Sequence, residues 1–175
     1  MAATNTERDI TLLRRLNNGD EGAIKDIFDI FYEPLCAYSL QFTEQEMASE
    51  DIVQDLFVNI WSRHLYKNIK HLSMYLFLAV RNQSVAYAKK QGHYEGIEDI
   101  EELAYSSMED GFTYDDIAAR KRKLDESLRH LSPKEYTVLT EIIINEKKYR
   151  QVAEEMHISV NTVKTHLRRA MQSLR

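Results

Sequence analysis

Apolar residues in the first half of the chain recur at intervals of three and four positions, the period of an amphipathic helix. The first segment follows Asp20, a candidate N-cap, and Pro34 is expected to bend or end it. A second helix is expected from about Ser49 to Trp61, with an apolar stripe of Ile52, Val53, Leu56, Phe57, Ile60 and Trp61. A third is expected from about His71 to Lys90, with an apolar side of Tyr75, Leu76, Leu78, Ala79, Val80, Val85 and Ala86.

The last third of the chain returns to a helical pattern, with a stripe of Leu124, Leu128 and Leu131. The residues after it have the form of a helix start: Ser132 as N-cap, Pro133 at the first helical position and Glu135 completing a capping box. Residues 92 to about 113 separate the two helical parts and carry three of the five glycines, without a sustained period. We therefore expect an extended tether there.

Residues 149–174 have the pattern of a helix-turn-helix. The first helix places Ala153 where two helices must approach closely, and Ser159 can cap the second. Glycine often stands where this turn has His157, so a positive φ is expected at that residue. The second helix should bury Val160, Val163, Leu167, Ala170 and Leu174.

The other face of that second helix is polar and basic, which suits the major groove of DNA. Its candidate DNA contacts are Asn161, Thr162, Lys164, Thr165, His166, Arg168 and Arg169. An ordinary helical hairpin with a solvated basic face is the alternative. Because the small residue, the capped turn and the local positive charge coincide, DNA binding is favoured.

The distribution of charge supports a nucleic-acid partner more than the total does. The 175 residues carry a net charge of −5, yet residues 56–94 hold six basic residues and no acid. Residues 95–116 hold nine acids and no base, and residues 147–175 hold seven bases against two acids. Two basic zones therefore flank an acidic strip, and local charge sets the field that a polyanion meets. The low counts of 5 Gly and 2 Pro favour an all-α fold.

Several classes of protein and site are not expected. The single cysteine, Cys36, excludes an internal disulfide, and no apolar run approaches the roughly 18–20 residues of a membrane span. The N-terminus lacks the apolar core of a signal peptide, so we expect a cytoplasmic protein without membrane insertion. The six histidines lack metal-ligand spacing, and no phosphate loop or nucleophile–base pair is present. We therefore expect no metal, no cofactor and no enzymatic activity.

Four segments, in their order along the chain, resemble an extracytoplasmic-function sigma factor of the primary-sigma family. Residues 49–61 are similar to the core-binding helix of that family, and residues 75–82 to its promoter-melting segment. Residues 131–136 stand where the family begins region four, and residues 158–164 with Arg169-Ala170 match its recognition helix. The resemblance implies two small helical domains, a region 2-like domain at 1–94 and a region 4-like domain at 121–175, joined by an acidic linker at 95–120.

The resemblance also implies partners: the β′ clamp helices and β flap of core RNA polymerase, double-stranded promoter DNA at the minus-35 element, the opened strand at the minus-ten element, and an anti-sigma factor. The implied polymerase contacts are Glu50, Asp51, Gln54, Asp55 and Asn59. From spacing alone, a solvated helix face is the alternative for these residues. The acidic linker either mimics nucleic acid in a basic channel of polymerase or serves as a solvated spacer.

The implied contacts to the minus-ten element lie on the third helix and are Arg81, Asn82, Tyr87, Lys89 and Lys90. Asn82 matches a family position that contacts the opened strand, and the cationic residues would hold phosphates. Tyr87 either stacks on a base or belongs partly to the core. The chain has Val85-Ala86 and Lys89 where the family has a Leu-Asp pair and an Arg, which leaves the downstream sequence preference open.

Two other functions remain as alternatives from the sequence. One is an ordinary DNA-binding regulator in which an N-terminal sensor or dimerisation domain controls the helix-turn-helix. The basic, acid-free stretch at 56–94 argues against it, because a sensor domain has no need of such a surface. The other is a nuclease, which would need a metal or acid–base constellation that the sequence lacks.

Overall fold

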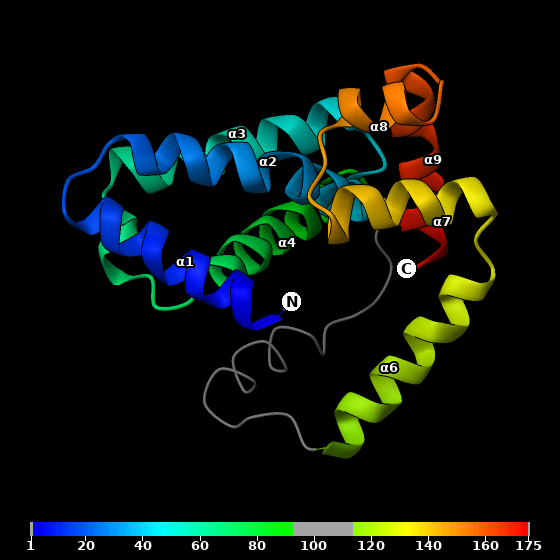
Figure 1. The fold of residues 1–175 in the computed structure, drawn as a ribbon, viewed down its shortest axis with the longest axis horizontal. Helices are drawn as coiled ribbons and strands as arrows, with labels where there is room; N and C mark the ends of the chain where they lie inside the picture. The colour runs from blue at the N-terminus through cyan, green and yellow to red at the C-terminus, as the bar shows by residue number, and fades with distance from the viewer. Residues whose placement is uncertain (1, 93–113, 175) are drawn as a thin grey trace.

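A computed structural model describes residues 2–92 and 114–174 of the chain (Figure 1). Every regular element within these two ranges is helical, which confirms the all-α fold. The elements are α1 (Ala2–Asn17), α2 (Gly22–Thr43), α3 (Glu46–Ser62), a 3-10 helix (Leu65–Asn68), α4 (Leu72–Lys90), α6 (Tyr114–Arg129), α7 (Pro133–Leu139), a π-helix (Thr140–Ile144), α8 (Tyr149–Glu155) and α9 (Val160–Ser173). The predicted acidic tether lies almost wholly outside the described residues, and α6 begins within the range predicted as linker.

Helices α1 to α4 form an N-terminal bundle around one apolar core. Helix α2 packs against both α3 and α4, and Leu35, Val53 and Leu76, one from each of these helices, are fully buried. Helix α1, which the apolar pattern does not predict, adds Leu12, Leu13 and Leu16 to this core.

The sequence predicts that Pro34 bends or ends its helix. The helix does not end there, because α2 continues to Thr43, so that part of the prediction is wrong. Proline lacks the N–H that would bond to the preceding turn, at a cost of roughly 3 kcal/mol inside a helix. Burial of the residues beyond it, including Leu35 and Leu40, offsets that cost. The predicted cap is shifted slightly: the helix begins at Gly22, whose N–H donates to Oδ1 of Asp20 at 2.9 Å.

The predicted apolar stripes of α3 and α4 need two corrections. Trp61 is 38% exposed and stacks on Tyr66 instead of joining the core. On α4, Ala86 is exposed, and the buried positions fall at every fourth residue: Leu72, Leu76, Val80, Ser84 and Ala88. Ser84 is tolerated in the core because its hydroxyl shares a 2.7 Å hydrogen bond with that of buried Ser39 on α2.

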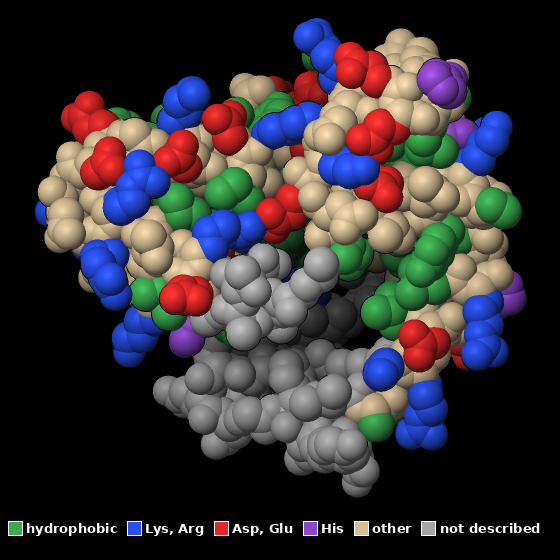
Figure 2. Space-filling view, in the orientation of Figure 1, with side chains coloured by type: hydrophobic (Ala, Val, Ile, Leu, Met, Phe, Trp, Pro, Cys, Tyr) green, Lys and Arg blue, Asp and Glu red, His purple; other side chains and the backbone are tan. Residues whose placement is uncertain are grey.

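Helices α7, α8 and α9 enclose a second core that contains Val138, Ile142, Val152, Val163 and Leu167. Leu131 is buried against it, whereas Leu124 on α6 is 50% exposed, contrary to the predicted stripe. Helix α6 extends away from the other helices, and a strip of apolar surface runs between it and α7 (Figures 1 and 2).

The two halves are packed against each other. Helix α9 contacts α2, and Ala37 of α2 is fully buried within the C-terminal core, not the N-terminal one. Helices α8 and α9 lie beside the end of α2 and the start of α3 (Figure 1). The second half of α2 therefore belongs to both cores.

The capping box of α7 is confirmed, and it yields a stability prediction. The N–H of Glu135 donates to Ser132 Oγ at 3.3 Å, and the N–H of Ser132 donates to Glu135 Oε2 at 2.9 Å. Ser132→Ala should lower the free energy of unfolding by about 1 kcal/mol, because an N–H at the helix start loses its partner. Urea unfolding measures it, with Ser127→Ala, a serine in the last turn of α6 that caps no helix start, as a control expected to lose nothing.

The same capping box should make stability depend on pH in the acid range. The backbone hydrogen bond from Ser132 lowers the pKa of Glu135 below its ordinary value of 4.5. A lowered folded pKa contributes stability above 4.5, and this is lost as the pH falls through the folded pKa. Glu135→Gln should therefore destabilise the chain at neutral pH and match the wild type more closely in acid. Equal destabilisation at both pH values would contradict this.

Candidate nucleic-acid interface

The turn between α8 and α9 has the geometry expected of a helix-turn-helix. His157 has φ of 54°, so the predicted positive φ is confirmed. The N–H of Thr162 donates to Ser159 Oγ at 3.0 Å, which confirms the predicted cap. Ala153 on α8 is buried, as close approach of the two helices requires. The turn therefore holds α9 at a defined angle to α8.

The inner face of α9 anchors the helix. Val163, Leu167 and Ala170 are fully buried, as predicted. Val160 and Leu174, at the two ends of the predicted stripe, are only half-buried, and Met171, which was not predicted, is buried. Because the anchored residues span most of the helix, its outer face is held in a fixed orientation.

The candidate DNA contacts on α9 do not share one environment. Asn161 and Arg169 are exposed, whereas the other candidates are half-buried. Thr165 already donates its hydroxyl to the Asn161 carbonyl at 2.9 Å. Nδ1 of His166 is buried without a hydrogen-bond partner. The most accessible base-reading groups of the helix are therefore Asn161 and Arg169.

Lys164 is held by the N-terminal bundle. Its Nζ lies 3.1 Å from Glu50 Oε1 and 3.5 Å from Glu46 Oε2, both on α3. Burial lowers the pKa of Lys164, but the hydrogen bond and charge of Glu50, together with Glu46, raise it above its ordinary value. The structure thus brings together one candidate DNA contact and one candidate polymerase contact.

The outer face of α3 carries most of the candidate polymerase contacts. Asp51, Gln54 and Asp55 are exposed side by side, whereas Asn59 is half-buried and Glu50 faces α9. Two apolar residues flank these polar groups, Met47 at 78% exposure and Val58 at 63%. Neither residue was predicted from the sequence, although the helical period could have found them. Asp51, Asp55 and Val58 follow Met47 by four, eight and eleven positions, so all four lie on one face of the helix. A mixed polar and apolar helix face of this kind suits a protein partner.

Helix α4 presents part of the candidate minus-ten set to solvent. Asn82, Lys89 and Lys90 are exposed, opposite the buried residues Ser84 and Ala88, whereas Arg81 is half-buried. Tyr87 is also half-buried, and its hydroxyl donates to Gln45 Oε1 at 3.1 Å. The exposed amide and cations can serve a nucleic-acid strand, while Tyr87 is tied to the start of α3.

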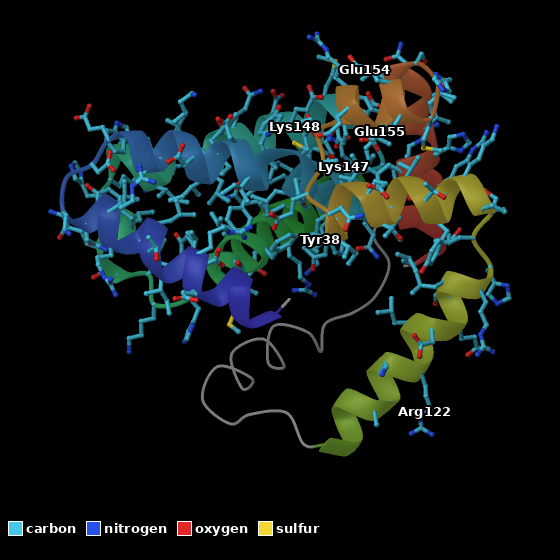
Figure 3. The ribbon with its side chains drawn as sticks, viewed as in Figure 1. Tyr38, Arg122, Lys147, Lys148, Glu154 and Glu155 are labelled. Carbon is cyan, nitrogen blue, oxygen red and sulfur yellow. The ribbon has the colours of Figure 1, made fainter. Side chains whose placement is uncertain are left out.

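The loop before α8 contributes less free positive charge than the sequence indicates. Lys147 Nζ lies 2.7 Å from Glu141 Oε2 and 2.6 Å from Glu155 Oε2. Its hydrogen bonds to these carboxylates, that to Glu141 first, raise its pKa. Figure 3 shows Lys147 and Lys148 in the loop that leads into α8, with Glu155 close by. Acidic and basic side chains are interspersed over the face seen in Figure 2.

Neither a metal site nor a membrane-spanning helix is found in the part of the chain that the structure describes. No group of three or more His, Cys, Asp or Glu side chains there is arranged to hold a metal ion. No helix in residues 2–92 or 114–174 is long and apolar enough to cross a membrane.

A comparison with known families places the helix-turn-helix in a defined domain. The family model described as Sigma-70, region 4 matches residues 121–174, which include α7, the capped turn and α9. No curated protein matches the chain. The matched domain has a role in promoter recognition, in agreement with the exposed Asn161 and Arg169 on an anchored α9. Residues 121–174 are therefore similar to region 4 of sigma-70 factors, and this match supports an extracytoplasmic-function sigma factor.

Proposed function

We propose that the chain is an alternative sigma factor that binds core RNA polymerase, recognises promoters and opens the downstream element. The observation that carries this proposal is the match to sigma region 4 over residues 121–174, where α9 is capped and presents a basic outer face. In this proposal residues 1–94 act as region 2, residues 95–120 as the linker and residues 121–175 as region 4. The chain itself performs no catalysis and acts in the cytoplasm, where bacterial polymerase works.

Helix α9 reads the minus-35 element in this proposal. Arg169 and Asn161 are long or polar, exposed side chains on a helix whose inner face is immobilised by packing. Arg pairs well with guanine and Asn with adenine in the major groove. Arg168, with a charged end group on the same helix, is suited to the phosphates that position the helix.

The outer face of α3 binds the β′ clamp helices. Its exposed centre, Asp51, Gln54 and Asp55, offers carboxylates and an amide, and Met47 and Val58 extend it with apolar area. Apolar area supplies affinity while charges set orientation and partner choice. The wider contact with polymerase includes the β flap, and an anti-sigma factor would act by covering these surfaces.

Helix α4 meets the opened strand of the minus-ten element. Asn82 and Lys89 lie on the exposed face of the helix, and residues 56–94 contain no acid that would repel phosphates. Strand opening needs a surface that binds the unpaired strand more tightly than the duplex, and exposed cations with polar groups for bases provide it.

The proposal is tested by co-elution of the purified chain with bacterial core RNA polymerase on a sizing column. Co-elution that excludes the housekeeping sigma factor is expected. Gln54→Ala with Asp55→Ala should reduce this binding at least tenfold while the helical content stays unchanged, since both side chains are exposed. Asn18→Ala with Glu21→Ala, an amide and a carboxylate exposed in the α1–α2 connection, is the matched control and should bind normally.

Separation of the chain from polymerase, with DNA binding retained, would instead support a regulator whose helix-turn-helix acts alone. Loss of helicity in the Gln54 and Asp55 variant would mean that this face belongs to the core. A labelled DNA that disappears only when Mg²⁺ is added would support a nuclease.

Arg169→Ala should weaken binding to a cognate duplex and reduce discrimination at one or two base pairs. Each lost bidentate base contact is expected to cost about 1–3 kcal/mol of discrimination. Binding to duplex pools selected from random sequence, with wild type and variant in parallel, measures both affinity and preference. Arg14→Ala, which removes one exposed charge from α1, should leave the preference unchanged. An unaltered preference in Arg169→Ala would show that another face of region 4 reads the DNA.

A further inference from the structure

The candidate recognition helix is bound, in this structure, by the helix proposed to bind polymerase. Lys164 is only 23% exposed, and its ammonium group lies 3.1 Å from Glu50 and 3.5 Å from Glu46. The same ammonium group lies 5.9 Å from the centre of the Tyr149 ring. A cation with two carboxylates within 4 Å has little capacity left for another anion.

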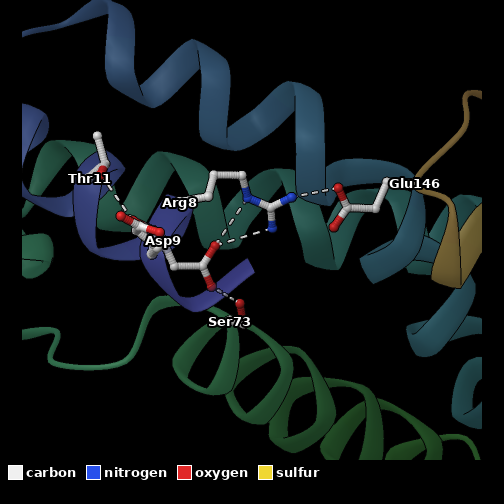
Figure 4. A network of polar contacts seen from close by, with 6 residues as sticks. Arg8, Asp9, Thr11, Ser73 and Glu146 are labelled. Atoms are coloured by element: carbon white, nitrogen blue, oxygen red, sulfur yellow. Dashed lines mark hydrogen bonds and ion pairs between the residues drawn. The ribbon is translucent and has the colours of Figure 1, made fainter. Parts of the chain in front are cut away.

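Further polar contacts join the same two halves. The N–H of Tyr149 donates to Glu33 Oε2 at 2.6 Å, and its hydroxyl donates to the Glu33 carbonyl at 3.2 Å. Arg8 of α1 reaches across to Glu146, in the loop before α8, at 2.6 Å (Figure 4). The Lys148 ammonium group donates to the Asp29 carbonyl of α2. The halves are therefore joined at several points, not by a single surface ion pair.

The centre of this contact contains buried apolar side chains. Ala37 of α2 is fully buried in the C-terminal core, and Leu40 and Leu167 are buried beside Tyr149. Burial raises the pKa of Tyr149 well above its ordinary value, and burial also raises that of Glu33. Both side chains are half-buried at this contact, in agreement with a packed interface.

We propose that this contact is a closed state of the free chain, in which the acidic faces of α2 and α3 hold region 4 and keep α9 from DNA. We call the contact of Lys164 with Glu46 and Glu50 the latch. The inference rests on the proposed function, because it assigns α9 to DNA and α3 to polymerase. It adds an intramolecular partner that competes with both.

The latch opposes DNA binding through charge. A phosphate that approaches Lys164 must displace two carboxylates that already neutralise it, and it meets their negative charge at close range. Asn161 and Arg169 stay exposed, but α9 cannot place its whole face against a duplex while it packs on α2 and its Lys164 is paired with α3. The apparent affinity for DNA is then reduced by the fraction of chains that are open.

Polymerase would release the latch because it competes for the same helix. Glu50 is both a latch residue and a candidate polymerase contact, and it lies one position before Asp51 and four before Gln54 on α3. A partner that binds this helix only when it is free favours the open state by its difference in affinity. By linkage, polymerase and promoter DNA should then bind cooperatively.

The single cysteine reports whether the contact is open. Cys36 is buried beneath the latch, where it lines a small cavity with Glu50, Tyr149 and Lys164. Its burial raises the pKa of the thiol to about 12, so it should react slowly with iodoacetamide in the closed state. When the contact opens, the thiol is exposed to solvent and ionises more readily. The rate of Cys36 alkylation therefore follows the fraction of chains that are open.

The decisive comparison is between two double variants. The latch variant carries Glu46→Gln and Glu50→Gln, and the α6 variant carries Asp125→Asn and Glu126→Gln. Both double variants remove two carboxylates, but those of the second lie exposed on α6. In the latch variant, Cys36 alkylation and affinity for a pool of short random-sequence duplexes should both rise roughly 2- to 10-fold, the scale set by two partly exposed ion pairs. The α6 variant should match the wild type in alkylation. Equal alkylation rates in all three proteins would overturn the inference.

A charge exchange provides a second test that does not depend on how the Gln variant folds. Lys164→Glu should open the contact and speed alkylation, because three carboxylates then meet. Adding Glu50→Lys to that variant should restore slow alkylation while DNA binding stays weak, since α9 still lacks its cation. Fast alkylation in both would contradict the latch, with far-UV circular dichroism confirming that each variant is folded.

The alkylation rate also separates this inference from the proposed function. It depends on the contact between the two halves and on the charges beside the thiol, such as that of Glu50, but on neither polymerase nor DNA. If the chain bound neither polymerase nor DNA while Cys36 still followed these charge changes, the closed state would stand and the proposed function would fail. Adding core polymerase to the wild type should accelerate alkylation; polymerase that co-elutes without changing the rate would show that it does not release the latch.

Discussion

The structure depends on the unbroken burial of α2. This helix packs on α3 and α4 in the first half of the chain and on α9 in the second, so its side chains serve two cores. That arrangement requires the helix to continue beyond Pro34, since Ala37 and Leu40 lie after it. The cost of an interior proline is borne because both halves bury apolar area on the continued segment.

The second constraint is the pairing of charge across the two halves. The acidic faces of α2 and α3 are close to basic groups of region 4, of which Lys164 is the most enclosed. Partly exposed ion pairs of this kind contribute little stability each, so the same set of charges can be exchanged for phosphates at small cost. Such near balance suits a contact that must open, whereas a fully apolar interface of the same size would not.

The helix-turn-helix combines a rigid support with an accessible surface. The cap of Ser159 and the buried residues Val163 and Leu167 hold α9 before any partner binds, and Ser132 caps α7, on which α9 packs. A helix that is already ordered loses little conformational entropy on binding, so its contacts can contribute to affinity and discrimination. The exposed polar groups of α3 and α4 are supported in the same way by the core beneath them.

Local features of the structure followed from the sequence because their causes are local. The capping box at Ser132, the cap at Ser159, the positive φ of His157 and the buried Val163 each depend on residues within one or two turns. The candidate recognition residues on α9 follow from the same periodicity.

Features that depend on distant partners could not be predicted in this way. Continuation of α2 through Pro34 and burial of Ser84 against Ser39 are set by neighbours far along the chain. The pairing of Lys164 with Glu46 and Glu50 joins residues more than a hundred positions apart, so only tertiary packing could place a cation of α9 on α3.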